Sequence, residues 1–206
     1  KTYYISGEIF SKANVIKFDK NKFQNCLYKG VLKCFYKNGK ILSEDEYTNE
    51  GIIIGISKSY YENGNIKSQV EFTEEGKMNS YMFFYENGNF YETKKFQNGI
   101  LNGLSKMYYE DGIVSKEVNY LNGKFHGEGK FYYKNGNVSV LQNFDNGKSI
   151  DAIYYFENGK KKSITNYTNE MKNGINQEFY ENGKLKTEAN YLNGKLHGKF
   201  VEYDEN

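Results

Sequence analysis

The sequence predicts an all-β protein, built as one elongated antiparallel meander of repeated β-hairpins. Three observations predict it. A motif of two aromatic residues, any residue, Asn or Asp, and Gly recurs about every 24 residues; apolar and polar residues alternate after each motif; and the composition has 21 Tyr, 15 Phe, 21 Gly and no Pro. Tyr and Phe favour half-buried strands, and Gly supplies the positive φ that tight turns need.

The glycines of this motif define a repeat. Successive copies lie 23 to 25 residues apart, with glycines at Gly39, Gly64, Gly88, Gly112, Gly136, Gly159 and Gly183. "YYISG" at residues 3–7 fits the same frame if an insertion lies near residues 18–25, and "YDEN" at residues 203–206 belongs to a truncated ninth unit. We therefore expect residues 1–206 to form one continuous array of about eight units, because self-similarity at such a period is typical of repeat architectures.

Each unit is predicted to contain two strands. Asn-Gly between alternating runs is a strong hairpin signal, through either a type I′ turn or a type I turn with a bulged glycine. In the unit around Gly136, "GKFYYK" leads into the turn and "VSVLQNF" leads out of it. The second and eighth residues after each glycine are mostly apolar, so we expect both on one half-buried face. Two strands in each of eight units give about sixteen short strands and almost no helix.

Two adjacent aromatic residues precede each turn, and neighbours in a strand point to opposite faces. The residues four before each glycine are called here the minus-four row, and those three before it the minus-three row. The minus-four row is Phe35, Tyr60, Phe84, Tyr108, Tyr132, Tyr155 and Phe179. The minus-three row is Tyr36, Tyr61, Tyr85, Tyr109, Tyr133, Phe156 and Tyr180.

The turn type decides which row shares a face with the second residue after the glycine. A type I′ turn pairs that residue with the minus-three row, and a bulged type I turn pairs it with the minus-four row, so the sequence leaves both open. We take the minus-three row as the buried one, because it is Tyr in six of seven units. The minus-four row is then the candidate binding ladder.

The only two histidines lie in a second repeated turn. "NYLNGKFHG" at residues 119–127 recurs as "NYLNGKLHG" at residues 190–198, with His126 and His197 before the last glycine. Other units carry Asn102 or Asn173 in that place. A catalytic or metal-binding histidine would not be exchanged for Asn along a repeat, so we interpret this residue as part of the turn.

Enzymatic chemistry is not expected, because an active site needs a singular constellation of residues and a repeat supplies periodic ones. We assign no catalytic residue, no metal site and no cofactor. Cys26 and Cys34 lack metal-ligand spacing, and whether they pair is left open. A formal net charge of +2 argues against nucleic-acid binding and against contact with an acidic membrane.

These units resemble the MORN repeat, specifically the bacterial variant with "YYENGK…YxNGKxHG" units. "NYLNGKLHGKFVEYDEN" and "YYENGNIKSQVEF" carry the resemblance, which extends over almost the whole chain and is weakest in residues 8–30. It implies a meander of hairpins and a scaffold role. Bacterial members often carry an "antitoxin" label, and others are exported or surface proteins. The absence of Trp departs from the eukaryotic pattern and weakens a phospholipid reading.

The leading hypothesis for function is a non-enzymatic scaffold that binds a protein partner through exposed tyrosines, which bring large area at low entropic cost. Export to the cell surface is favoured over the cytoplasm. One alternative is carbohydrate or cell-wall binding by stacking on the aromatic rows, and another is a mechanical spacer. Sheet edges also allow self-association.

Overall fold

The protein is described by a computed structural model for residues 1–4, 6–17 and 27–206. The chain divides into two compact units: residues 1–100 with 110–112 form the first, and residues 101–109 with 113–206 form the second. Over these described residues both units consist of strands and turns. No helix in that part of the chain is long and apolar enough to cross a membrane. The predicted insertion near residues 18–25, and Cys26, lie outside the described residues.

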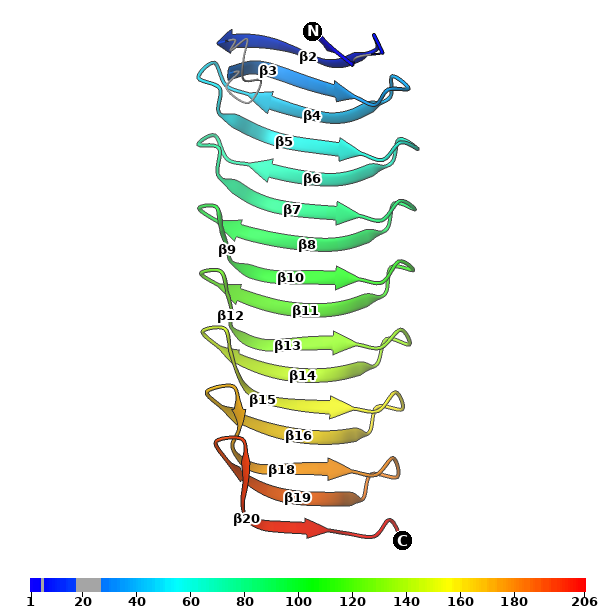
Figure 1. Cartoon of the computed structure of the whole chain (residues 1–206), viewed down its shortest axis with the longest axis vertical. Coiled ribbons are helices and arrows are strands. Elements are labelled where there is room, and N and C mark those ends of the chain that lie inside the picture. The colour runs from blue at the N-terminus through cyan, green and yellow to red at the C-terminus, as the bar shows by residue number, and fades with distance from the viewer. Residues whose placement is uncertain (5, 18–26) are drawn as a thin grey trace. The chain divides into compact units, whose positions relative to one another are not determined.

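The first unit is an antiparallel meander in which each strand pairs with the next (Figure 1). Its strands are β1 (Thr2–Tyr3), β2 (Ile9–Lys17), β3 (Leu27–Phe35), β4 (Ile41–Tyr47), β5 (Ile53–Tyr60), β6 (Ile66–Phe72), β7 (Met78–Phe84) and β8 (Phe90–Gln97). The division between the units falls within the short strand β9 (Ile100–Leu101).

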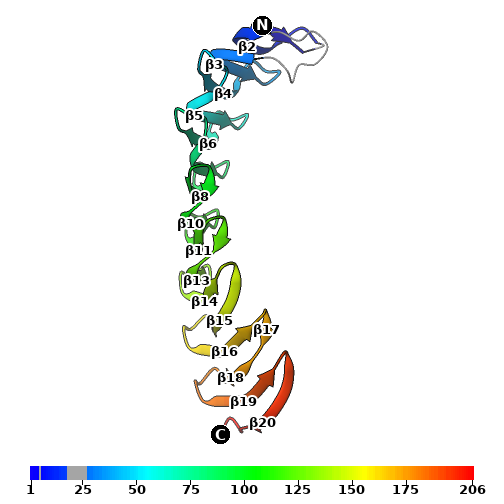
Figure 2. The ribbon, with the colours of Figure 1, turned by 90° about the vertical axis from the view of Figure 1, so that its left-hand side faces the viewer.

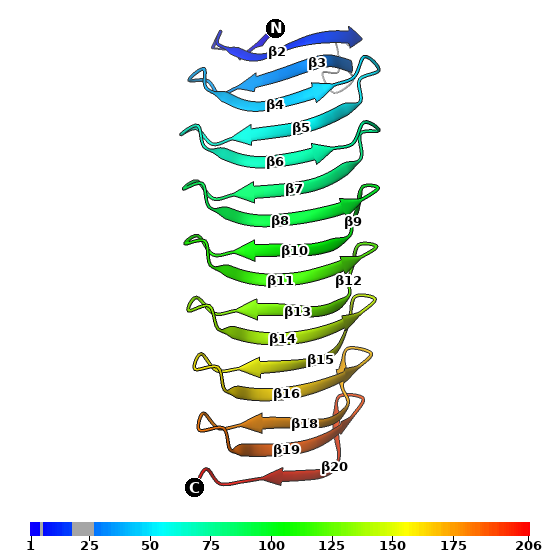
Figure 3. The same cartoon turned by 180° about the vertical axis from the view of Figure 1, so that it is seen from behind.

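The second unit repeats this design, and its strands are curved (Figure 2). They are β10 (Gly103–Tyr108), β11 (Val114–Leu121), β12 (Lys124–Phe125), β13 (Gly127–Tyr132), β14 (Val138–Asp145), β15 (Lys148–Tyr155), β16 (Lys161–Thr168), β17 (Met171–Lys172), β18 (Gly174–Phe179), β19 (Leu185–Leu192) and β20 (Lys195–Glu202). The short strands β12 and β17 pair with the end of the preceding strand, at the second turns; Figure 3 shows β12 from behind. Apart from four two-residue strands, the described residues form sixteen strands, which agrees with the predicted number.

The Asn-Gly tips are type I turns with a bulged glycine. In the tip at Gly136, the Gly136 N–H donates to the Tyr133 carbonyl at 3.0 Å and the Tyr133 N–H donates to the Asn137 carbonyl at 2.8 Å. The φ of Gly136 is 85°, in the left-handed region that favours glycine. Of the two turn types that the sequence left open, the structure therefore has the bulged type I turn.

A second irregularity follows each tip and corrects one expectation. Tyr132 pairs with Val138, but Phe131 pairs with Val140, so Ser139 is an extra residue in the second strand. Directly opposed residues share a face, and neighbours in a strand lie on opposite faces. The second residue after the glycine therefore lies on the side of the minus-four row, and the fourth, sixth and eighth lie on the other side. The expectation that the second and eighth residues share a face is wrong, because this bulge interrupts the alternation.

The sheet of each compact unit thus has two faces. The minus-four face carries the minus-four row and the second residue after each glycine; Phe84 and Phe90 stack there with ring centroids 4.9 Å apart. The minus-three face carries the minus-three row. There the ring of Tyr85 lies edge-on to that of Tyr91, with centroids 5.2 Å apart, and Phe83 lies edge-on to the same Tyr91 ring at 5.6 Å. Phe83 and Tyr91 therefore share this face. The eighth residues after each glycine also lie on the minus-three face.

Few side chains are fully buried. Among the described residues the buried apolar ones are Leu32, Val118, Ala152 and Ala189, and all four lie on the minus-three face. Both aromatic rows are half-buried. The exposed fraction therefore does not by itself distinguish a buried ladder from a binding ladder.

Hydrogen bonds between successive repeats give the minus-three row a structural role. The Tyr109 hydroxyl donates to the Tyr132 carbonyl and the Tyr133 hydroxyl to the Tyr155 carbonyl, both at 2.7 Å. In the first unit, the Tyr61 hydroxyl donates to the Phe84 carbonyl at 2.7 Å. The phenol of one repeat thus binds the backbone of the next, which explains why this row is Tyr in six of seven units.

Candidate functional site

The minus-four face brings together the candidate binding ladder and a charged row that sequence reasoning did not link to it. In the second unit, the Tyr132 hydroxyl donates to Glu117 Oε2 at 2.8 Å, and Lys106 Nζ lies 2.6 Å from Glu117 Oε1. The Lys106 ammonium holds the pKa of Glu117 below its ordinary value. Burial, and then the hydrogen bond to Glu117, raise the pKa of Tyr132 to about 12. The tyrosine therefore stays neutral as a donor at physiological pH.

The first unit contains the same arrangement. Lys33 Nζ lies 2.5 Å from Glu44 Oε1, and the Tyr60 hydroxyl donates to Glu44 Oε2 at 3.0 Å. The pKa of Glu44 is lowered, chiefly by the Lys33 hydrogen bond. The polar ends of these ladder tyrosines are thus fixed by carboxylates, and their rings are held in defined orientations.

A second row of exposed side chains on this face was missed. The residue eight before the glycine lies on the same face as the minus-four row, because the two are separated by an even number of strand positions. At that position Val31, Ile56, Leu104 and Ile175 are 38–56% exposed. The signal for this row is present in the sequence, as apolar residues that recur eight positions before the turn glycine.

The histidine position belongs to the second turn. The His126 N–H donates to the Asn119 carbonyl at 3.0 Å, and in the later repeat the Asn173 N–H donates to the Asn166 carbonyl at 2.9 Å. His126 Nδ1 lies 3.7 Å from Asp145 Oδ1, with both side chains at least half exposed. The backbone bond is thus the same whether the residue is His or Asn.

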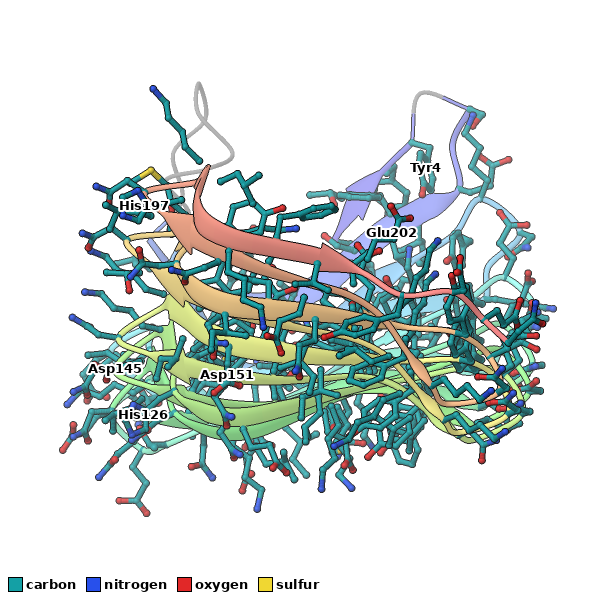
Figure 4. The ribbon with its side chains drawn as sticks, turned by 90° about the horizontal axis from the view of Figure 1, so that it is seen from below. Tyr4, His126, Asp145, Asp151, His197 and Glu202 are labelled. Carbon is teal, nitrogen blue, oxygen red and sulfur yellow. The ribbon has the colours of Figure 1, made fainter. Side chains whose placement is uncertain are left out.

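His197 is exposed in β20, and Figure 4 shows it, like His126 and Asp145, at the edge that carries the second turns. In the described part of the chain, no three His, Cys, Asp or Glu side chains come together as metal ligands would. Nor is Cys34 joined in a disulfide to another described residue. Burial raises the pKa of its thiol, which disfavours the thiolate that acts as a nucleophile.

The hairpin repeat, the interlocking tyrosines and the Asn-Gly tips define the class of protein: an all-β repeat module. A family model described as the MORN repeat variant matches residues 28–49, 54–74, 101–122, 150–169 and 172–193, and a MORN repeat model matches residues 119–138. These matches cover more than half of the chain. The chain belongs to the MORN repeat family, a non-catalytic family whose repeats commonly bind proteins or membranes.

Other comparisons are remote. A porin-like protein from Bacteroides uniformis is 8% identical, with 92% of this chain and 93% of that chain covered and a TM-score of 0.25. The structure of TcdB2-TccC3-Cdc42 is 11% identical, with a TM-score of 0.17, and the match spans 98% of this chain but 13% of that chain. No curated protein matches the chain. These TM-scores are too low to support an argument about function.

Proposed function

We propose that this chain is a non-enzymatic scaffold that binds a protein partner through its minus-four face. The observation that carries the proposal is the composition of that face. Aromatic rings and exposed aliphatic side chains alternate there with fixed Lys–Glu pairs, as at Lys106 and Glu117. Aromatic residues are enriched at the cores of protein interfaces, and Tyr is among the residues that supply most of the binding energy there.

The tyrosines of the two faces differ in the hydrogen bond that a substitution by alanine would remove. The minus-three tyrosines donate to the backbone of the next repeat, whereas Tyr132 on the minus-four face donates to a half-buried side-chain pair, Glu117 with Lys106. This supports the minus-four row as the surface available to a partner. The finer proposal of a cell-surface or toxin-related partner rests on the family resemblance alone.

The test compares capture of proteins from native extract by the wild-type chain and by the double variant Tyr108→Ala, Tyr132→Ala. A captured protein is then purified and titrated against both chains. We expect each alanine to weaken binding by about 1–2 kcal/mol. Lys134→Ala, in an exposed turn, is the matched control and should bind like the wild type.

Circular dichroism and urea unfolding show whether the double variant keeps its fold. The minus-three variants Tyr109→Ala and Tyr133→Ala should instead destabilise the chain by about 3 kcal/mol. If the double variant is folded and binds the purified partner with unchanged affinity, the minus-four face is not the binding surface.

A further inference from the structure

A hollow of about 330 Å³ opens on the minus-three face of the second unit, along strands β15, β16, β18 and β19. Rings of Tyr154, Tyr167 and Tyr191 line it. Its lining also includes Thr165 and Asn176, polar residues that are 5% and 6% exposed. The volume is at the lower end of the range of about 300–1,000 Å³ that is usual for small-molecule sites.

The same face two repeats earlier shows why this space is open. There, Phe125 packs between the rings of Tyr120 and Phe144, with centroids 4.8 Å and 5.1 Å away. Phe125 pairs with Tyr120 just as Lys172 pairs with Tyr167 two repeats later. The ring that fills the space between two aromatic residues is therefore replaced by a lysine, whose Nζ lies 5.3 Å from the centroid of Tyr191.

Other substitutions between the two repeats also make the hollow polar. Phe131, five before its turn glycine, corresponds to Glu178, and the buried Val118 corresponds to Thr165. Glu178 and Thr165 both line the hollow. Apolar residues are thus exchanged for polar ones at several positions of one face, while the aromatic residue eight after the glycine is retained.

The remaining groups are hydrogen-bonding ones on aromatic walls. Burial, and then a hydrogen bond with Tyr154, raise the pKa of Tyr167 to about 12, so its hydroxyl is a neutral donor or acceptor. Ser163 and Thr187 add hydroxyls, and Lys172 adds an ammonium. Such a lining offers ring faces for C–H groups and many short-range partners for hydroxyls.

We propose that this hollow is a saccharide-binding site that takes one pyranose ring, with the apolar side of the sugar against a tyrosine and its hydroxyls on the polar groups. A sugar combines in one small ligand an apolar ring face with a rim of hydroxyls, which is the combination that the lining offers. Asn176 is already bonded within the protein, since its Oδ1 accepts from the Asn166 N–H at 3.2 Å and its Nδ2 donates to the Gly174 carbonyl at 3.0 Å. The hydroxyls of Ser163 and Thr187 and the Lys172 ammonium are therefore the groups that a sugar would use and an apolar ligand would not. The site lies on the face opposite the minus-four row and is independent of the proposed protein binding.

The test uses saturation-transfer NMR with the methyl glycosides of glucose, N-acetylglucosamine and glucuronic acid at millimolar concentration. We expect transfer to at least one of the three. Lys172→Phe, which introduces the ring found two repeats earlier at Phe125, should fill the hollow and weaken binding at least tenfold while the fold is kept. Lys195→Phe, at an exposed lysine of β20, is the matched control and should bind like the wild type.

Thr165→Val, which also introduces the residue found two repeats earlier, should weaken binding several-fold without the bulk of the phenylalanine. Tighter binding of the glucuronide than of the glucoside would support Lys172 as the partner of its carboxylate, and equal binding would support recognition of the ring alone. The proposal is overturned if none of the three glycosides receives saturation, or if Lys172→Phe, folded by circular dichroism, binds as the control does.

Discussion

Two hairpin repeats of the second unit share one backbone frame and carry different chemistry. Residues 114–147 and 161–194 have matching turn bonds: the Gly147 N–H donates to the Phe125 carbonyl at 2.8 Å, and the Gly194 N–H donates to the Lys172 carbonyl at 2.9 Å. The first repeat fills its minus-three face with rings, and the second leaves a polar hollow there. The frame is thus set by turn glycines and interlocking tyrosines, and the residues between them can vary.

We call the region with the polar hollow the polar repeat and the region filled with rings the apolar repeat. The largest effect is expected when a residue of the polar repeat replaces its counterpart in the apolar repeat. Two repeats after Gly129 the corresponding residue is Asn176, and a Cβ at position 129 would lie 3.0 Å from both Phe144 Cε2 and Val118 Cγ1. Gly129→Asn should therefore lower the free energy of unfolding by about 3 kcal/mol, measured by urea denaturation. A decrease of less than about 1 kcal/mol in the free energy of unfolding would show that the apolar repeat accommodates a polar side chain at this position.

Removal of the central ring should cost less, because Phe125 is half-buried. Phe125→Ala should lower the free energy of unfolding by about 2 kcal/mol, below the usual range for a fully buried Phe. Lys172→Ala at the corresponding position should change it by less than about 0.5 kcal/mol. Equal costs in the two repeats would contradict the view that only one of them depends on this position for packing.

The interlocking phenol should contribute about 1 kcal/mol. Tyr133→Phe keeps the ring and removes only the hydroxyl that donates to the Tyr155 carbonyl. Phe156 is the one member of the minus-three row without a hydroxyl, so Phe156→Tyr is the reciprocal variant and should not destabilise the chain. The effect is measured as the midpoint temperature of thermal unfolding of both variants. If Tyr133→Phe has the same midpoint as the wild type, the bond does not stabilise the fold.

The second turns differ by a strained residue. Asn122 and Gly123 have φ of 51° and 79°, whereas the polar repeat places Asn169 and Glu170 at 52° and 64°. A left-handed conformation costs a residue with a side chain about 1–2 kcal/mol, partly offset by the entropy that glycine loses. Glu170→Gly should raise the free energy of unfolding by about 0.5–1 kcal/mol in urea denaturation, and a decrease would refute this assignment of strain.

The smallest effect is expected at the histidine position. Replacement of both His126 and His197 by Asn should change the free energy of unfolding by less than about 0.5 kcal/mol, because Asn173 already makes the same backbone bond in the polar repeat. Isothermal titration with Zn²⁺ on both chains is the second measurement. Tighter zinc binding by the wild type than by the double variant would show that the histidines are more than turn residues.

The repeat length, the position of each tip and the two-strand unit could be predicted because they depend on local chemistry. Asn-Gly and alternating apolar residues report on turns and faces within a few positions. The bulge after each tip could not be predicted in the same way. The extra residue, such as Ser139, is visible only in the pairing of the two strands, and it moves the second residue after the glycine to the other face.

The features of the candidate site can likewise be separated into those that local sequence sets and those that tertiary packing sets. By itself the sequence determined that two aromatic rows lie on opposite faces and that the His position is occupied by Asn in other repeats, because both follow from periodicity. Only the tertiary structure decided what each row contacts. Tyr109 reaches a carbonyl and Tyr132 reaches Glu117, each one repeat away in the chain. The hollow between Tyr167 and Tyr191 likewise depends on which side chains of successive repeats meet. Such contacts arise from strand pairing and the packing of neighbouring repeats, which no local pattern specifies.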